Sequence, residues 1–167
     1  MSGGGVFRIT LSRALVIVFA VMAAEFSIPV GIKAGEVNAA VVYVIDGDTI
    51  VARLENGKRE KVRLKGIDCP KIDEPYYGQA SAFTREMVLG KKVKLITAGR
   101  GNYGRLLAYV IVDGKSLNLQ LVENGLARIY TGNFAPKNRS TLKRYMRMEE
   151  KAKENGLGIW KTDDPTR

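Results

Sequence analysis

The chain has 167 residues, a formal net charge of +10 and 46% hydrophobic side chains. These values predict one globular domain with its own core and exclude a wholly disordered chain. With no histidine and one cysteine, the sequence also excludes a Ser-His-Asp hydrolase, an internal disulfide and a multi-cysteine metal cluster. The positive charge indicates a polyanionic partner, with nucleic acid first and an anionic membrane surface second.

The first element in chain order is an N-terminal leader. Arg8 and Arg13 precede eleven apolar residues, 14–24, a run that is shorter than the about 20 residues of a membrane span and typical of a secretory signal. We therefore expect residues 1–39 to be a signal peptide and spacer, and the rest to work in the periplasm or outside the cell. An uncleaved membrane anchor that continues through residues 26–32 is the alternative.

Predicted strands follow the leader. Residues 40–45 and 49–54 are β-branched runs joined by an Asp-Gly-Asp turn, and the Asn56-Gly57 pair predicts a hairpin into the alternating residues 58–67. Two more strands are expected later in the chain, at residues 92–97 and 105–112. The first three strands should form a meander.

Three amphipathic helices are expected at residues 78–90, 116–125 and 140–156, each ending at a glycine. Ser116 and Ser140 are the predicted N-caps of the second and third helices. Five strands with one inserted helix and two later helices predict an α+β fold that is mainly β, a five-stranded oligonucleotide-binding (OB) barrel with three flanking helices. We expect this domain to cover residues 40–162 and to be followed by a frayed tail at 163–167.

Three short motifs contain the polar residues that can carry chemistry. Asp46 and Asp48 flank a glycine between two predicted strands, although ordinary turn chemistry also explains this pattern. Arg63 and Asp68 are five residues apart, so a bulge or a strand end must bring them to the same side of the sheet. Arg105 begins an apolar strand directly after a glycine.

These motifs belong to a longer series that resembles the staphylococcal-nuclease-like (thermonuclease) family in order and spacing. The series is IDGDT, VRL with DCP, YGQASAFT, YGRLLAY, LVENGLA and GIW, and it spans residues 41–160. The resemblance implies an OB barrel with three helices and a calcium-dependent enzyme that hydrolyses phosphodiester bonds of DNA and RNA.

The resemblance also implies a metal site. Asp48 and Asp68 match the calcium-binding carboxylates of the family, and Cys69 stands where a threonine provides its backbone carbonyl as the third protein ligand. Because a carbonyl ligand does not depend on the side chain, cysteine is compatible with that role. Two carboxylates and a carbonyl leave room for water and a phosphate oxygen on a hard cation.

A phosphate-binding site is implied in the same way. Arg63 and Arg105 match the two arginines that bind the scissile phosphate, and Tyr103 matches the tyrosine beside that site. Guanidinium groups pair with phosphate in a bidentate manner and stabilise the charge that develops on its oxygens during the reaction.

One residue departs from the family pattern. Lys71 stands two residues after Cys69, where the family has the glutamate that accepts a proton from the attacking water. A protonated lysine cannot be that base, and loss of a general base typically costs about 10²- to 10⁴-fold in rate. Asp73 and Glu74 are the candidate replacements, and the sequence does not choose between them.

The leading prediction is thus an exported, calcium-dependent nuclease of reduced activity that acts on DNA or RNA and is a monomer. A catalytically inactive OB module that binds nucleic acid is the alternative, because binding phosphate and stacking bases requires no general base. A third hypothesis, an adhesin that holds anionic polymer at the cell envelope, requires the leader to remain as a membrane anchor.

Overall fold

The computed structural model describes residues 35–132 and 138–161, so the predicted tail and most of the predicted leader lie outside the described residues. Within these two ranges, no helix combines the length and the apolar character that a membrane span requires. The expectations about export, anchoring and the tail therefore stay predictions.

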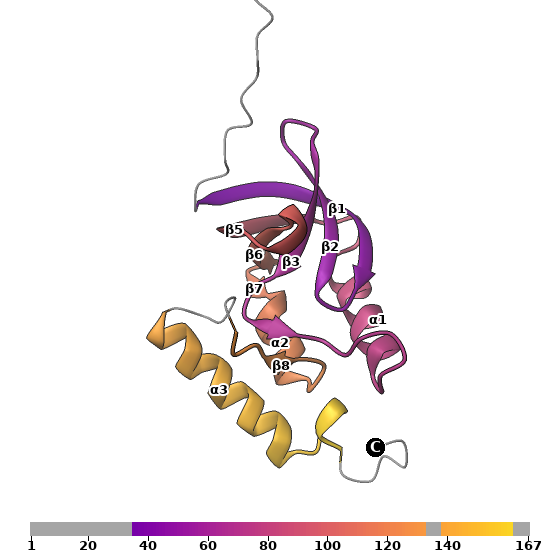
Figure 1. Cartoon of the computed structure of the whole chain (residues 1–167), viewed down its shortest axis with the longest axis vertical. Helices are drawn as coiled ribbons and strands as arrows, with labels where there is room; N and C mark the ends of the chain where they lie inside the picture. Colours follow the sequence, from indigo (N-terminus) through magenta and orange to yellow (C-terminus); the bar gives the residue numbers. More distant parts are fainter. Residues whose placement is uncertain (1–34, 133–137, 162–167) are drawn as a thin grey trace, which may run out of the picture. The chain divides into compact units, whose positions relative to one another are not determined.

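Five strands form a barrel (Figure 1). They are β1 (Glu36–Asp46), β2 (Thr49–Leu54), β3 (Arg59–Leu64), β5 (Lys92–Arg100) and β6 (Leu106–Val112). Neighbouring strands pair in antiparallel fashion in the order β3-β2-β1-β5-β6, and a parallel pairing between β3 and β6 closes the sheet. The predicted α+β fold with a five-stranded OB-type barrel is confirmed.

β1 begins at Glu36, earlier than the predicted start at Ala40. The added residues pair with β5, from Glu36 opposite Ile96 to Ala40 opposite Lys92. Acidic and amide side chains are uncommon in strands, so it is the pairing with β5 that extends β1 beyond its apolar run.

Three helices flank the barrel, namely α1 (Tyr77–Val88), α2 (Leu117–Glu123) and α3 (Arg139–Glu154). α1 packs against β1 and α2, while α2 packs against β6 and α3.

The N-cap prediction for α2 is confirmed, since Ser116 Oγ accepts from the backbone N–H of Leu119 at 3.3 Å. The prediction for α3 is wrong. Asn138, not Ser140, is its N-cap, because the Asn138 side chain accepts from the N–H groups of Ser140 and Thr141.

Apolar side chains fill the interior of the barrel and continue onto the helices. The largest of the fully buried side chains include Ile50, Leu64, Leu95, Leu106, Leu117 and Leu121. α1 adds Ala80 and Val88, and α3 adds Tyr145 to the same cluster. This core fixes the strands and helices whose ends carry the polar residues of interest.

Two short strands form a second, two-stranded sheet, of which β8 lies beside α3 (Figure 1). β3 ends at Leu64, and Gly66 adopts a positive φ of 81°, a conformation that glycine accepts without steric cost. The chain then forms β4 (Ile67–Asp68), which pairs with β8 (Arg128–Ile129), whereas β7 (Lys115–Ser116) pairs with β6. The end of β3 therefore provides the change of direction that the Arg63–Asp68 spacing requires.

Candidate active site

The turn between β1 and β2 is fixed from two sides. The Thr84 hydroxyl of α1 donates to the carbonyl of Gly47 at 2.7 Å. A side chain at Gly47 would lie only 2.9 Å from both Ala80 Cβ and Cys69 Sγ, so the turn can approach α1 this closely only with glycine. The first carboxylate of the site, Asp48, follows this glycine directly.

Asp48 is buried, with 1% of its surface exposed, and its two oxygens have four partners. Oδ1 lies 2.6 Å from Arg63 Nη1 and accepts from the Thr49 hydroxyl at 3.0 Å. Oδ2 accepts from the Cys69 backbone N–H at 2.9 Å and from Lys71 Nζ at 3.2 Å. A buried carboxylate requires such compensation, because an unpaired charge in the interior is strongly unfavourable.

Arg63 joins the two carboxylates that the sequence placed in the site. Its Nη1 is 2.6 Å from Asp48 Oδ1, and its Nη2 is 2.8 Å from Asp68 Oδ1. Arg63 is 8% exposed, whereas the side chain of Asp68 is 44% exposed, so the cluster extends from the interior to the surface. The structure thus brings Asp48, Arg63, Asp68 and Cys69 together.

Lys71 completes this cluster. Its Nζ lies 2.9 Å from Asp68 Oδ1 and 3.2 Å from Asp48 Oδ2, so a single ammonium bridges the two carboxylates. Burial lowers the pKa of Lys71, but its interactions with Asp48 and Asp68 outweigh that effect and leave the pKa raised. Lys71 is therefore protonated at neutral pH and cannot be the general base, as its chemistry predicted.

Burial raises the pKa of two groups beside this cluster, the carboxyl of Asp46 and the thiol of Cys69. Burial raises the pKa of Asp46, and the negative charge of Asp48 raises it further. Burial raises the pKa of the Cys69 thiol well above its usual range, so the side chain stays neutral. If Cys69 acts as a ligand, only its backbone carbonyl is available for that role.

The side chains as they lie do not fit a divalent cation. The ammonium of Lys71 contacts the same two carboxylates that the family resemblance assigns to calcium. Among residues 35–132 and 138–161, no three His, Cys, Asp or Glu residues are grouped in a way that could hold a metal ion. A calcium ion would have to displace Lys71 before both carboxylates could bind it.

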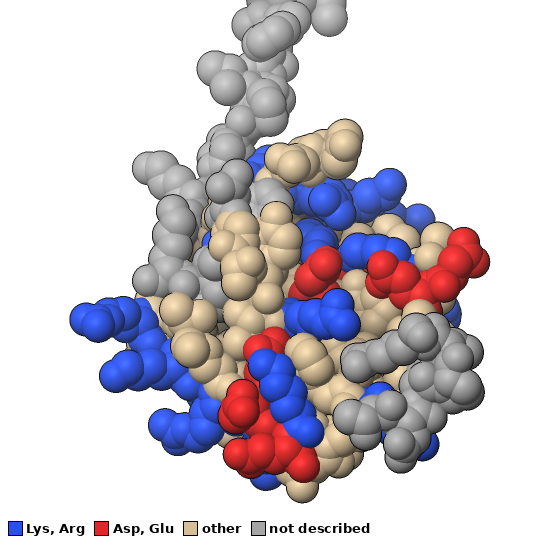
Figure 2. All heavy atoms as spheres, turned by 60° about the horizontal axis from the view of Figure 1, so that its bottom comes forward, with Lys and Arg blue, Asp and Glu red and all other residues tan. Residues whose placement is uncertain are grey.

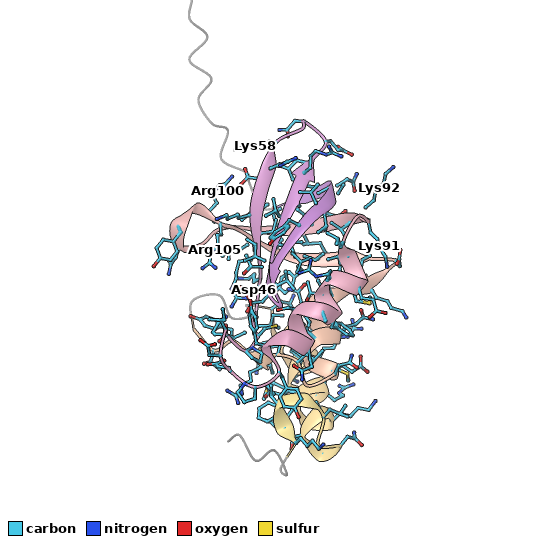
Figure 3. The ribbon with its side chains drawn as sticks, turned by 90° about the vertical axis from the view of Figure 1, so that its right-hand side faces the viewer. Asp46, Lys58, Lys91, Lys92, Arg100 and Arg105 are labelled. Atoms are coloured by element: carbon cyan, nitrogen blue, oxygen red, sulfur yellow. The ribbon has the colours of Figure 1, made fainter. Side chains whose placement is uncertain are left out.

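Arg105 and Tyr103 come from the connection between β5 and β6. Arg105 Nε donates to the Asn102 carbonyl at 3.4 Å, and its guanidinium carbon lies 5.9 Å from the centre of the Tyr103 ring. Tyr103 is 95% exposed. In Figure 3, Arg105 lies between Arg100 and Asp46. In the part of the chain that the structure describes, neither Arg105 nor Tyr103 directly contacts the Asp48–Arg63–Asp68 cluster.

A surface cavity of about 350 Å³ adjoins the cluster. Its walls contain Asp68, Cys69, Pro70, Lys71, Glu74, Pro75, Tyr76, Arg128 and Ile159. Glu74 belongs to this wall and its Oε2 accepts from the backbone N–H of Lys71 at 2.7 Å, while Asp73 is not part of the wall. Of the two candidate bases, Glu74 is therefore the one beside the site.

Arg128 is a lining residue that the sequence analysis missed. It lies opposite Asp68 in the pairing of β4 with β8, and its guanidinium carbon is 5.4 Å from the centre of the Trp160 ring. In the sequence, the only indication of a role for Arg128 was its position directly after the LVENGLA motif. The pairing of two strands of two residues each has no pattern of its own in the sequence.

Comparison with known proteins assigns the family. The profile of the family described as "Staphylococcal nuclease homologue" matches residues 61–162. The chain belongs to this family. It is thereby a hydrolase of the nuclease type, and members of the family generally depend on a metal ion.

Three relatives illustrate the similarity. An uncharacterized endonuclease of Haemophilus influenzae is 31% identical over 125 residues, covering 75% of this chain and 67% of the relative. Endonuclease YncB of Bacillus subtilis is 39% identical over 134 residues, covering 74% of this chain and 62% of the relative. A thermonuclease of Staphylococcus hyicus is 33% identical over 138 residues, with coverage of 77% and 78%. The chain thus spans less than two thirds of the Bacillus endonuclease.

Proposed function

We propose that this protein hydrolyses phosphodiester bonds of DNA or RNA at the cluster of Asp48, Arg63 and Asp68, and that its turnover is slow. The observation that carries this proposal is the position of Arg63, whose guanidinium is held by two carboxylates at 2.6 and 2.8 Å. One of these carboxylates, Asp68, lines a surface cavity together with Lys71. Membership in a nuclease family supports the type of reaction.

Positive groups provide the binding of the phosphate backbone. Arg63 and Lys71 belong to the cluster, and Arg105 lies on the β5–β6 connection. Figure 2 shows Lys and Arg side chains over several parts of one face, with acidic side chains gathered in smaller groups. Such a surface attracts nucleic acid of any sequence, and the attraction weakens as salt is added.

The attacking water requires a proton acceptor, and Lys71 does not provide one. We assign this role to Glu74, because its carboxylate lines the same cavity as Asp68 and is held at the backbone of Lys71. One oxygen of Glu74 already accepts the backbone hydrogen bond from Lys71, so the carboxylate is oriented by that bond and not by the attacking water. This placement is the physical reason for the slow turnover that we propose.

Calcium, which the family resemblance implies, would have to displace the Lys71 ammonium from Asp48 and Asp68. No step of the proposed reaction passes through a metal ion. Of the described residues, Arg63 orients the phosphate and offsets its charge, and Glu74 accepts the proton of the attacking water as the new P–O bond forms. The ester P–O bond breaks, and the leaving oxygen takes a proton from solvent.

A nucleic-acid-binding module without turnover is the second candidate function. The specific observation in its favour is that the ammonium of Lys71 contacts Asp48 and Asp68, the two carboxylates that would otherwise be available to a metal ion. This module would keep the same basic surface and the exposed Tyr103, and lose only the chemical step.

A hydrolysis assay with end-labelled single-stranded DNA and RNA tests the proposal. We expect slow cleavage by the wild type, a rate lower by about tenfold to a hundredfold in Glu74→Gln, and an unchanged rate in the matched variant Asp73→Asn. Tight binding of both strands without any cleavage would refute the enzyme and support the binding module.

We also propose that the protein is exported, as the leader predicts. N-terminal sequencing of protein from the cell envelope or medium should find a start between residues 24 and 40, or an intact Met1 in membrane fractions if the leader is an anchor. Intact Met1 on protein from the soluble cytoplasmic fraction would contradict export.

A further inference from the structure

We propose that the ammonium of Lys71 is a built-in cation that takes the place of a divalent metal ion between Asp48 and Asp68. The site then assembles, and binds nucleic acid, without metal. This inference rests on the proposed function only for the identity of the ligand, because it concerns binding and assembly and not hydrolysis.

The charges of the contacting side chains favour this assignment. Asp48 and Asp68 contribute two negative charges, and Arg63 and Lys71, which contact both of them, contribute two positive charges. The cluster is therefore balanced without any added ion. A calcium ion would add two positive charges at the same place, with repulsion that is strong near buried Asp48.

The position of Lys71 is fixed by the backbone as well as by its side chain. The backbone N–H of Lys71 donates to Glu74 Oε2 at 2.7 Å, and the residue follows Pro70. Its ammonium then reaches Asp68 at 2.9 Å, a distance of charge-assisted hydrogen bonds, and Asp48 at 3.2 Å, at the long end of the ordinary hydrogen-bond range. This geometry holds the cation at the carboxylates before a ligand arrives.

The same ammonium is accessible to a phosphate. An ammonium has three N–H donors, and the two carboxylate contacts use two of them. The Lys71 side chain is 51% exposed, so the remaining donor can reach solvent. Lys71 can therefore give the phosphate a positive partner at the position where the resemblance places a metal ion.

Calcium titration calorimetry tests the replacement directly. We expect no calcium binding by the wild type at millimolar concentrations, and binding with a Kd of about 10⁻⁴ to 10⁻³ M or tighter in Lys71→Met and Lys71→Glu. Lys92→Glu makes the same charge change on β5, away from Asp46 (Figure 3), and should not bind calcium. Calcium affinity in the wild type equal to that of Lys71→Glu would overturn the proposal.

Nucleic-acid binding gives an independent readout. Fluorescence anisotropy with a phosphorothioate single strand should give the same wild-type affinity in EDTA and in calcium, while Lys71→Glu should bind more weakly in EDTA and recover in calcium. Wild-type affinity that falls about tenfold or more in EDTA would overturn the proposal. Circular dichroism checks the fold of each variant, and Lys71→Met carries the test if Lys71→Glu is unfolded. Because no cleavage is measured, an inactive wild type leaves this result intact.

Discussion

Two clusters at the barrel each join an arginine to a buried carboxylate, and they distribute their ionic contacts differently. In the first, Arg100 on β5 binds both oxygens of Glu60 on β3, at 2.9 and 3.0 Å, and Lys58 adds a contact at 2.8 Å. The hydrogen bonds from Arg100 are the main reason that the pKa of Glu60 is lowered to about 2. This cluster has one carboxylate as its centre, and we call its bidentate Arg100–Glu60 contact the closed pair.

In the second cluster, each cation is divided between two carboxylates. Arg63 gives one nitrogen to Asp48 and the other to Asp68, and the single ammonium of Lys71 also contacts both. We expect that a phosphate replaces Asp68 as a partner of Arg63 during binding, while Asp68 keeps its contact with Lys71. The comparison indicates that a closed bidentate pair stabilises the fold, whereas shared pairs can exchange partners with a ligand.

The largest expected effect comes from removing the shared arginine. Arg63→Leu leaves buried Asp48 without its guanidinium partner, so the free energy of unfolding should fall by about 3–5 kcal/mol. The affinity for nucleic acid should also fall, while the remaining basic side chains retain part of the binding. The matched variant Arg100→Leu should lose less stability, about 1–3 kcal/mol, because Lys58 still pairs with Glu60. It should keep more of its affinity, because the contacts of Arg100 are with Glu60 and the Gly104 carbonyl and not with the second cluster. Urea unfolding and anisotropy measure both quantities. Equal losses of affinity in the two variants would remove the distinction between the clusters.

The second effect concerns turnover. Lys71→Glu restores a carboxylate at the position where the family has its base, and we expect hydrolysis in the presence of calcium to rise by about 10²-fold or more. Affinity for an uncleavable strand in calcium should change only modestly, because Arg63 and Arg105 are retained. Initial rates on labelled single-stranded DNA, beside Lys92→Glu as the charge control, measure the change. Brisk wild-type cleavage that Lys71→Glu fails to improve would mean that Glu74 is already an efficient base.

The third effect is a pH dependence that belongs to the closed pair. The pKa of Glu60 is about 2 in the folded protein and 4.5 in its ordinary state, so this carboxylate contributes stability above pH 4.5. That contribution decreases as pH falls from 4.5 and is gone below about 2. Thermal unfolding should therefore show a steeper loss of stability between these pH values in the wild type than in Glu60→Gln. Parallel curves for the two proteins would contradict a lowered pKa at Glu60.

The sequence predicted the barrel and named the residues that meet in the Asp48–Arg63–Asp68 cluster, because both depend on local patterns. Apolar alternation and turn residues mark the strands, and short motifs mark Asp48, Arg63 and Asp68. The early start of β1 and the position of Arg128 depend instead on pairing between distant strands. The charge of Lys71 was readable from the sequence, but its bridge between two carboxylates depends on how the turn after β4 faces the turn after β1.

The smallest expected effect is at Arg105, which lies outside both clusters. Its contacts are the Asn102 carbonyl at 3.4 Å and the Tyr103 ring at 5.9 Å, so Arg105→Ala should leave stability nearly unchanged. If Arg105 binds one phosphate, the slope of log affinity against log salt should become shallower by about 1. Lys92→Ala, which also removes one positive charge from the barrel surface, is the control for a general loss of charge. An identical change of slope in both variants would show that Arg105 acts only through the overall charge and makes no specific phosphate contact.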